Sequence, residues 1–329
     1  MIISQTPLRI SLAGGGTDLR EYYSQHEGMV VSTAIDKYLY VIVKERFDDL
    51  IYVDYSKKEI VESIDEIQHE LVREAARATG IEKGFEVMMF ADIPSEGSGL
   101  GSSSSLTVGL LHAFSEYMGE QVTHEFLASK ACEIEIEILK RPIGKQDQYI
   151  TAYGGLKKIK FNKDESVEVK EVKLESDLRR KLGSNLQLFF TNTTRTAASI
   201  LQEQKDNIET KLSFHHRIKE LAVKSASALE KAELNKIGEY LKDNWELKKQ
   251  LASNISNAEI DEMYSAAMRG GALGAKISGA GGGGFLLVYC ERSQQEKLRN
   301  EMKAYRELPF LLDKFGSKII FNQTRYDIK

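Results

Sequence analysis

The sequence predicts an α+β protein with two lobes, and three observations support this prediction. Strand-like runs dominate the first half of the chain, whereas residues 197–269 are almost entirely helical in pattern, without proline. Runs of strands followed by runs of helices are typical of α+β proteins. A chain of 329 residues is also long enough for two domains of ordinary size. We expect the lobes to be residues 1–195 and 196–329.

The first half mixes strands with helices. Apolar and alternating runs predict strands, and apolar residues recurring every three or four positions predict helices. The expected strands are 7–13, 29–35, 38–44, 51–55, 85–93 and 186–192, and the expected helices are 64–79, 106–118 and 123–141. Turn-prone residues at 162–166 divide two alternating runs, which predicts a hairpin over 156–174.

The second half is mainly helical. The helical pattern that begins at residue 197 stops at Gly270-Gly271, a plausible helix terminator. A glycine-rich stretch then leads into an apolar strand over 285–290, followed by a helix over 294–306 and a last strand over 318–322. The chain shows no internal repeat.

Composition excludes several classes of protein. A formal net charge of −4 argues against general nucleic-acid binding, which needs a basic face. No apolar stretch approaches the ~20 residues needed to cross a bilayer, and the N-terminus lacks the layout of a signal peptide. The two cysteines, Cys132 and Cys290, are far apart and read as reduced core thiols. We therefore expect a cytoplasmic protein without membrane or nucleic-acid partners; its oligomeric state cannot be read from the sequence.

A segment rich in glycine and serine, residues 94–105, lies between the expected strand 85–93 and the expected helix 106–118. Glycines bring backbone N–H groups close to an anion, and the following helix adds unpaired N–H donors and the positive end of its dipole. Serine hydroxyls suit phosphate oxygens or Mg²⁺. We predict a phosphate-binding loop here, with a flexible linker as the alternative.

The spacing within this segment excludes three common nucleotide-binding motifs. The chain has no Gly-x-x-x-x-Gly-Lys-[Ser/Thr] sequence, so the loop is not of the Walker type. Gly97, Gly99 and Gly101 alternate without the third offset of a dinucleotide fingerprint. The His-Arg-Asp and Asp-Phe-Gly sequences of protein kinases are also missing.

Two further glycine-bearing loops are candidates for the same site. Gly14–Gly16 end an N-terminal strand and are followed by Thr17 and Asp18, whose carboxylate can accept hydrogen bonds from vicinal hydroxyls; an ordinary turn is the alternative. The stretch 279–284 contains five glycines in six residues, each costing about 0.5–1 kcal/mol in regular structure. We expect this stretch to approach the phosphate loop closely, with a wide turn as the alternative.

One glutamate of the expected helix 123–141 faces inward. Leu127, Ala131, Ile134 and Ile138 cluster on one face at ~100° per residue. Glu135 falls beside that face, whereas its neighbours at 133 and 137 point away. A buried carboxylate is costly unless it is paired or binds a metal. We expect Glu135 to bind a metal or to form a buried salt bridge.

Asp147 follows the break at Arg141-Pro142 and lies two residues after Lys145. A nearby ammonium would lower the pKa of Asp147 and hold it ionised. An ionised carboxylate suits a residue that accepts or directs a hydroxyl proton during phosphoryl transfer. A helix N-cap is the alternative role.

Three motifs in this order resemble those of the GHMP kinases, a superfamily named for galactokinase, homoserine kinase, mevalonate kinase and phosphomevalonate kinase. The motifs are Pro7–Asp18, Pro94–Ser104 and Lys276–Gly284, so the resemblance spans essentially the whole chain. It implies a two-lobed fold, with a mixed α/β N-terminal lobe and a ferredoxin-like C-terminal lobe. ATP and a small acceptor would bind between the lobes.

The resemblance also implies roles for individual residues. Asp147 would be the catalytic aspartate, Arg9 would lie near the transferred phosphoryl group, and Ser103 and Glu135 would bind Mg²⁺. Asp18, with Thr17 beside it, would hold sugar hydroxyls, and Gly279 and Gly281 would border the substrate. The ATP phosphates would contact Pro94, Gly97, Ser98, Gly99, Leu100, Gly101, Ser102, Ser103 and Ser104.

Within the superfamily the chain looks most like the bacterial kinases of D-glycero-D-manno-heptose 7-phosphate, which phosphorylate the anomeric hydroxyl for surface-polysaccharide synthesis. Gly15-Gly16 stand where galactokinases have Glu-His, which counts against galactose. The planar guanidinium of Arg195 suits bidentate binding of the phosphate that the sugar already carries, and a surface arginine at a helix start is the alternative for this residue. Lys145 and Arg269 are weaker candidates for binding that phosphate. Another sugar-1-kinase, for fucose, galacturonate or an N-acetylhexosamine, and a non-catalytic sugar or ATP sensor are the competing interpretations.

Overall fold

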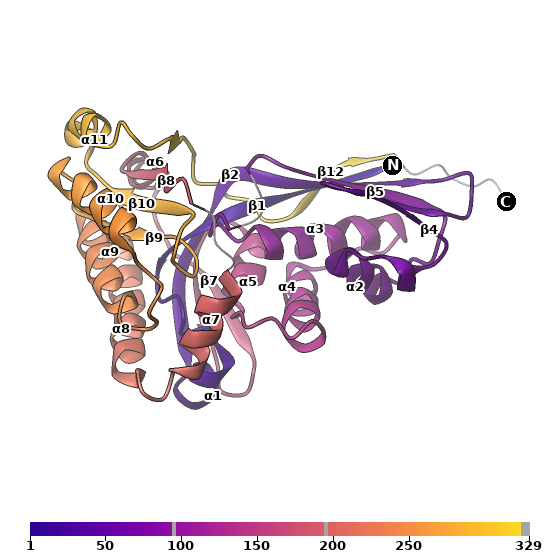
Figure 1. Ribbon diagram of the computed structural model, residues 1–329, viewed down its shortest axis with the longest axis horizontal. Coiled ribbons are helices and arrows are strands. Elements are labelled where there is room, and N and C mark those ends of the chain that lie inside the picture. The colour runs from indigo at the N-terminus through magenta and orange to yellow at the C-terminus, as the bar shows by residue number, and fades with distance from the viewer. Residues whose placement is uncertain (94–96, 194–196, 324–329) are drawn as a thin grey trace.

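The computed structural model describes residues 1–93, 97–193 and 197–323. These residues form an eight-stranded and a four-stranded sheet with helices packed against them, which confirms the predicted α+β class. The helices α8–α11 gather beside the smaller sheet, and α2–α4 lie along the larger one (Figure 1). Within the described ranges, no helix has the length and apolar character needed to cross a membrane.

The larger sheet is built around two long antiparallel strands, β1 and β2, and its main path runs β12-β1-β2-β5-β3-β4, with β6 pairing with β2 and β7. Its strands are β1 (Ile2–Ala13), β2 (Gly28–Glu45), β3 (Ile51–Asp54), β4 (Lys58–Val61), β5 (Phe85–Ala91), β6 (Leu156–Phe161), β7 (Val167–Glu171) and β12 (Lys318–Asn322). The smaller sheet has the order β11-β8-β10-β9. Its strands are β8 (Leu186–Phe190), β9 (Gly274–Ile277), β10 (Phe285–Tyr289) and β11 (Glu307–Leu308).

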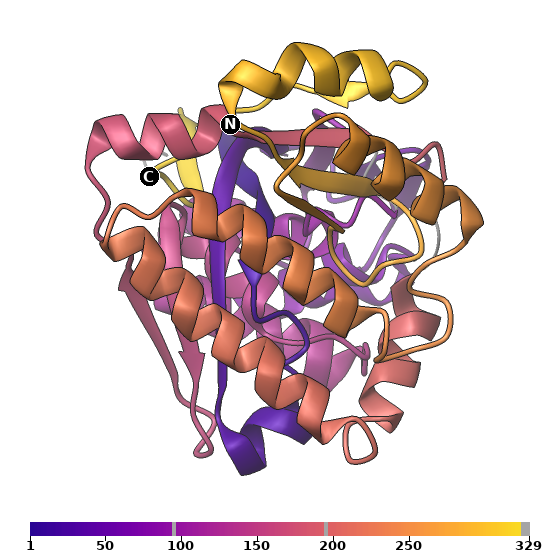
Figure 2. The same ribbon diagram turned by 90° about the vertical axis from the view of Figure 1, so that its left-hand side faces the viewer.

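Helices cover both sheets. The first half contains α1 (Arg20–His26), η1 (Ile64–Glu66), α2 (Glu70–Thr79), α3 (Ser102–Tyr117), α4 (His124–Cys132), η2 (Glu133–Ile138) and α5 (Gln146–Tyr153). The second half contains α6 (Ser176–Ser184), α7 (Ala197–Asp206), α8 (Leu212–Glu230), α9 (Asn235–Lys248), α10 (Ala258–Arg269), η3 (Arg292–Gln294) and α11 (Gln295–Glu301). Helix α3 packs on β1 and β2, whereas α8 and α9 lie side by side (Figure 2).

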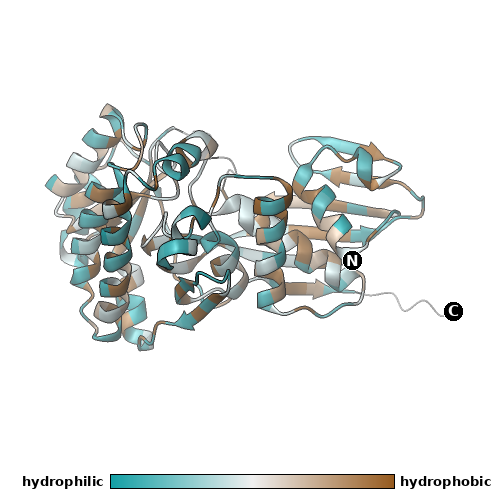
Figure 3. Cartoon of the chain, turned by 90° about the horizontal axis from the view of Figure 1, so that it is seen from below, coloured by the Kyte–Doolittle hydropathy of each residue, from teal (hydrophilic) through white to brown (hydrophobic). Residues whose placement is uncertain are grey.

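Strands β1 and β2 contribute to two hydrophobic cores. Leu8 and Ile10 belong to the core beneath α8–α10, and Ile2 and Val41 belong to the core beneath α2–α4. Hydrophobic and hydrophilic residues alternate along the helices that cover these cores (Figure 3). Because the same two strands run through both cores, the cores share one scaffold.

The division into two lobes at residue 195 remains a prediction. Strand pairing crosses this division. β8 precedes residue 195 but pairs with β10, and β12, at the end of the chain, pairs with β1. The two segments predicted as separate strands, 29–35 and 38–44, form the single strand β2. A register shift opposite Pro7 and Leu8 leaves Asp36 and Lys37 outside the β1 pairing, and this bulge explains the interrupted pattern in the sequence.

The helix predicted over 123–141 is not one α-helix. After Cys132 it widens into a π-helix over Glu133–Ile138, with the N–H of Leu139 bonded to the carbonyl of Ile134. The wider turn shifts the phase of the face that packs inward. The prediction that Ile138 lies on the buried face is therefore wrong, because its side chain is 47 % exposed, and Leu139 packs against the core instead.

Candidate active site

The loop before α3 has the backbone geometry of an anion cradle. Gly97, Gly99 and Gly101 all have positive φ, and Gly101 is the N-cap residue of α3. The first N–H groups of a helix have no partners within the helix, so the start of α3 offers donors and the positive end of a helix dipole. Ser98 steadies the turn because its hydroxyl accepts from the N–H of Leu100 and contacts the hydroxyl of Ser102, at 3.0 Å.

The third glycine-rich stretch packs directly on this loop, which confirms the expected close approach. A Cβ atom on Gly279 would lie 2.6 Å from the Cα of Gly99, and one on Gly284 would lie 2.5 Å from the carbonyl oxygen of Ser98. Side chains at these positions would separate the two backbones. The contact explains why both loops need glycine.

Glu135 is fully buried beneath the start of α3, which confirms the inward orientation expected from its position in the sequence. Its Oε1 accepts from the hydroxyl of Ser103 at 2.7 Å, and its Oε2 accepts from the hydroxyl of Ser104 at 2.8 Å and from Gln148 at 2.7 Å. Arg141 Nη1 lies 3.3 Å from Oε1 and donates to Ser103 at 2.6 Å. Burial raises the pKa of Glu135, and these hydrogen bonds oppose that rise.

Arg9 joins the phosphate loop to Asp147. Its guanidinium donates to both oxygens of Asp147, at 2.7 and 2.6 Å, and to the carbonyl oxygen of Gly99, at 2.6 Å. The bidentate pair fixes the plane of the carboxylate. Lys145, the partner expected from the sequence, instead donates to Glu165 at 2.7 Å. Asp147 lies in the first turn of α5, and Lys145 occupies the N-cap position, so the alternative N-cap role is not observed.

Asp18 is buried beside Asp147. Its oxygens accept from the N–H groups of Gly16, at 2.9 Å, and Gln146, at 3.2 Å. Burial and, to a smaller extent, the charge of Asp147 together raise the pKa of Asp18 to about 6. A Cβ atom on Gly144 would lie 2.0 Å from Oδ2 of Asp18, so glycine is required there for a close approach.

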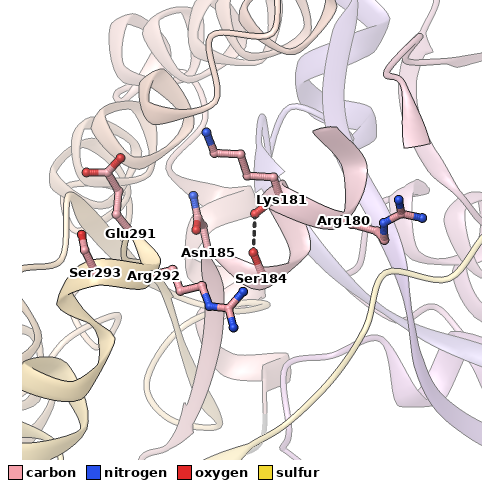
Figure 4. Close-up of a pocket in the computed structure, with 7 residues that line it drawn as sticks. All are labelled: Arg180, Lys181, Ser184, Asn185, Glu291, Arg292 and Ser293. Atoms are coloured by element: carbon pink, nitrogen blue, oxygen red, sulfur yellow. Dashed lines mark hydrogen bonds between the residues drawn. The ribbon is translucent and has the colours of Figure 1, made fainter. Parts of the chain in front are cut away.

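Most of these groups line one cavity of about 810 Å³, but Glu135 lies behind Ser103 and Ser104 and does not border it. The phosphate loop, Arg9, Asp18 and Asp147 all border it. Two buried polar atoms that border it, Ser11 Oγ and Gln146 Oε1, have no hydrogen-bond partner among the described residues. A second hollow, lined by Arg180, Lys181, Ser184, Asn185, Glu291, Arg292 and Ser293, contains none of these groups (Figure 4). The larger cavity is therefore the candidate active site.

Two family models match the chain. The model of the GHMP kinases N terminal domain matches residues 58–155, and that of the GHMP kinases C terminal domain matches residues 225–307. The D-glycero-alpha-D-manno-heptose 7-phosphate kinase of Campylobacter jejuni subsp. jejuni serotype O:2 is 32% identical over 93% of both chains. The chain belongs to the GHMP kinases. It is therefore an ATP-dependent phosphotransferase with an alcohol group as acceptor, as the motifs predicted.

Other relatives and solved structures agree with this assignment. The L-fucokinase/L-fucose-1-P guanylyltransferase of Bacteroides fragilis is 27% identical over 89% of this chain and 35% of its own length. A D-glycero-D-manno-heptose 1-phosphate kinase from Bacteriodes thetaiotaomicron superposes with a TM-score of 0.82 at 25% identity, over 98% of this chain and 100% of that one. Lactococcus lactis galactokinase, at 19% identity, shares the fold with a TM-score of 0.76, over 96% of this chain and 94% of that one.

Not all residues predicted for the site of this GHMP kinase border the cavity. Thr17 is buried, and its hydroxyl donates to the carbonyl oxygens of Gly14 and Met29. Gly281 packs on Ile255. Leu100, Glu135, Lys145 and Arg269 are also absent from the cavity lining. Arg269 is paired with Glu262 and Glu301 on the surface. Pro94 and Arg195 lie outside the described residues.

Sequence reasoning missed three cations that border the cavity: Arg141, Lys248 and Lys276. Lys276 opens the third motif, so its position was a usable signal. Lys248 lies in a Lys-Lys-Gln run, which is typical of the solvated face of a helix, yet Lys248 is buried. Only the packing of α9 on β9 reveals this lysine.

Proposed function

We propose that this GHMP kinase transfers the γ-phosphoryl group of ATP to the anomeric hydroxyl of D-glycero-D-manno-heptose 7-phosphate, giving the 1,7-bisphosphate. One observation carries the proposal: a single cavity holds the glycine loop, a fixed carboxylate at Asp147 and buried polar atoms without partners among the described residues. The named activity of the Campylobacter jejuni relative, similar over 93% of both chains, supports this acceptor.

The glycine loop supports a site for the β- and γ-phosphates. Its backbone N–H groups and the start of α3 offer donors to an anion without a side-chain charge. Leu100 anchors the loop because its side chain is fully buried and its carbonyl oxygen accepts from the N–H of Arg9 at 2.9 Å. Positioning and neutralisation of charge supply most of the catalysis in phosphoryl transfer.

The residues beside the loop fit a magnesium ion. Mg²⁺ is usually held by one or two carboxylates together with substrate phosphates rather than by a cage of side chains. Ser103, at the start of α3, would supply a hydroxyl from the cavity wall, and Glu135 of η2 would supply a carboxylate from directly behind it. No cluster of three or more metal-binding side chains occurs among the residues that the structure describes. When bound, the ion would neutralise charge on the phosphate oxygens.

Asp147 would act as the base. In the proposed step the anomeric oxygen forms a bond to the γ-phosphorus, the bond from that phosphorus to the bridging oxygen of ADP breaks, and the hydroxyl proton passes to the Asp147 carboxylate. Arg9 orients that carboxylate and brings a positive charge next to Gly99 of the phosphate loop. Its charge would oppose the negative charge on the phosphoryl group.

The acceptor side of the cavity suits a polyol. Ser11 and Gln146 border the cavity, and their Oγ and Oε1 atoms are buried without partners among the described residues. Such atoms are costly to bury, and sugar hydroxyls would satisfy them. Asp18 adds a carboxylate that can accept from vicinal hydroxyls.

Measuring ADP release with a panel of sugars tests this proposal. We expect turnover with D-glycero-D-manno-heptose 7-phosphate, and a new anomeric phosphate signal in the ³¹P NMR spectrum of the product. The unphosphorylated heptose, L-fucose, D-galacturonate and N-acetylhexosamines should react far more slowly. Preferred turnover of an unphosphorylated sugar would favour another sugar-1-kinase, and no ADP release with any sugar would favour a sensor.

A further inference from the structure

The third glycine-rich stretch is held by hydrogen bonds at both of its ends. At its far end, Gly284 donates its N–H to the carbonyl oxygen of Thr193 at 2.9 Å. At its near end, where β9 leads into it, Nζ of Lys248 donates to the carbonyl oxygens of Ile277, at 3.1 Å, and Gly279. A backbone group therefore holds the far end, whereas one side chain bonds two carbonyl groups at the near end.

Helix α9 brings Lys248 to this position. Lys248 is the last residue of the helix, and α9 packs on β9. One turn earlier, Asn244 Oδ1 accepts from Nζ of Lys276 in β9 at 3.2 Å, so α9 bonds this part of the chain through two side chains. The negative end of the helix dipole favours a cation in the last turn. The end of α9 therefore presents Lys248 to the start of the glycine-rich stretch.

The near end is also where the stretch meets the phosphate loop. A Cβ atom on Gly279 would lie 2.6 Å from the Cα of Gly99, and Lys248 bonds the carbonyl oxygen of the same Gly279. The carbonyl oxygen of Gly99 in turn accepts from Arg9 at 2.6 Å. A displacement of Gly279 would therefore reach both the phosphate loop and the arginine that orients Asp147.

The two hydrogen bonds of Lys248 do not need its charge. Lys248 is buried at the border of the cavity, and the charged groups that face it among the described residues are Arg9 of β1 and Lys276 of β9. Burial and, to a smaller extent, the charge of Arg9 lower the pKa of Lys248 to about 7. A neutral amine keeps two N–H groups, one for each carbonyl oxygen. Lys248 can therefore hold the stretch in either protonation state.

We propose that Lys248 is a positioning residue for the nucleotide, because its two hydrogen bonds hold Gly279 against Gly99 of the phosphate loop. This inference rests on the proposed function in placing the ATP phosphates at residues 97–104, but it does not depend on which sugar is the acceptor. Lys248 acts through the shape of the loop and does not bind a phosphate group itself.

Binding of β,γ-imido-ATP with Mg²⁺, measured by calorimetric titration without a sugar, tests the proposal. Lys248→Met has a side chain of similar length but no donor, so the Kd should rise at least roughly tenfold. Lys248→Gln keeps an amide donor and should lose less affinity. Replacing a buried charge with an apolar side chain of similar size is compatible with folding. Wild-type affinity in both variants would overturn the proposal.

Lys249→Met is the matched control. Lys249 is the next residue, and its ammonium pairs with Glu246 at 3.0 Å instead of bordering the cavity. We expect wild-type affinity in this variant. In steady-state kinetics, Lys248→Met should raise the KM for ATP, whereas the KM for the sugar should change less than about threefold. An equal rise in both KM values would show a general distortion of the site and would also contradict the proposal.

The pH profile separates positioning from direct binding of a phosphate by the ammonium charge. Above pH 8 Lys248 is mostly neutral. If Lys248 positions the loop, the ratio of the Kd of Lys248→Met to that of the wild type should stay the same between pH 6 and pH 9. A ratio that falls towards one at pH 9 would show that the charge binds the phosphate, and would overturn the positioning role.

Gly279→Ala distinguishes a failure of this inference from a failure of the proposed site. Weaker binding of β,γ-imido-ATP in Gly279→Ala, with wild-type affinity in Lys248→Met, would overturn the role of Lys248 alone. Wild-type affinity in both variants would place the nucleotide away from the two loops, and the proposed function would then lose its phosphate site as well. The identity of the acceptor does not enter, because the titration contains no sugar.

Discussion

At the scale of single residues, Asp147 is the group on which the proposed chemistry depends. Asp147→Asn keeps the shape of the side chain but removes the base, so kcat should fall ~100-fold or more. Binding of ATP should persist, because Asp147 is not part of the glycine loop. Asp177→Asn, an exposed aspartate paired with Arg180, is the control. A wild-type rate in Asp147→Asn would remove Asp147 from the catalytic role.

Glu135 is the residue we expect to support Mg²⁺. Glu135→Gln keeps the volume and removes the charge, so the Mg²⁺ concentration for half-maximal rate should rise at least roughly tenfold. Glu133→Gln is the matched control from the same π-helix, because Glu133 is exposed and pairs with Lys130. Titration of MgCl₂ at fixed ATP measures both variants. The same Mg²⁺ dependence in both would exclude Glu135 as a ligand.

The raised pKa of Asp18 predicts a pH-dependent stability. The pKa is about 6 in the folded protein, compared with an ordinary value of 3.8. Folding therefore favours the protonated form, and this contribution is lost as pH rises towards 6. Between pH 4 and pH 7 the unfolding free energy of the wild type should fall, relative to that of Asp18→Asn, by up to about 3 kcal/mol. Urea unfolding of both proteins measures this difference, and a constant difference would contradict it.

The sequence predicted some of the site residues because their signals are local. The helical periodicity that placed Glu135 inward needs only neighbouring residues, and it held although the helix widens there. The partner of Asp147 was not predictable in this way, because Arg9 is 138 residues away and meets it only when β1 packs beside α5. The buried state of Lys248 likewise depends on packing between distant elements.

At the scale of elements, the contact between the two glycine-rich loops should control nucleotide use. Gly279→Ala would place a Cβ atom 2.6 Å from Gly99, in a backbone conformation with φ of +66°. We expect kcat/KM for ATP to fall at least roughly tenfold, because small displacements of positioning groups are costly. Steady-state kinetics with varied ATP measures the effect.

Gly80→Ala separates backbone strain from the contact. Gly80 has φ of +72°, and a Cβ atom added there would meet no other atom within 4 Å. The Gly80→Ala variant should therefore lose about as much folding stability from backbone strain as Gly279→Ala does, roughly 1–2 kcal/mol. Its kinetic constants should equal those of the wild type. Equal kinetic losses in both variants would show that strain, rather than contact between the loops, limits activity.

Most elements could be predicted because their patterns are regular. The hairpin of β6 and β7 and the last strand over 318–322 occur as expected. The departures occur where a local irregularity is not visible in the pattern: the bulge at Asp36 and Lys37 within β2, and the π-helix after Cys132.

At the scale of the whole molecule, the two cores should unfold together. Strands β1 and β2 run through both cores, and β12 returns to pair with β1. Trp245, the single tryptophan, is buried in the core beneath α8–α10, whereas circular dichroism reports all elements. The two signals should therefore give the same midpoint in urea. An earlier transition by either signal would indicate lobes that unfold separately.

The order of the elements was easier to predict than how the sheets join them. Hydrogen bonding between β8 and β10, and between β1 and β12, connects strands far apart in the sequence. Local periodicity carries no information about such pairs. The predicted division at residue 195 therefore had no basis other than composition. Composition cannot show that the chain returns to its first strand.

The most direct test is a crystal structure with a non-hydrolysable ATP analogue, Mg²⁺ and heptose 7-phosphate. We predict that the triphosphate lies against residues 97–104, with the anomeric oxygen ~3 Å from the carboxylate of Asp147. A triphosphate bound far from residues 97–104, or an anomeric carbon facing away from Asp147, would contradict the proposed site.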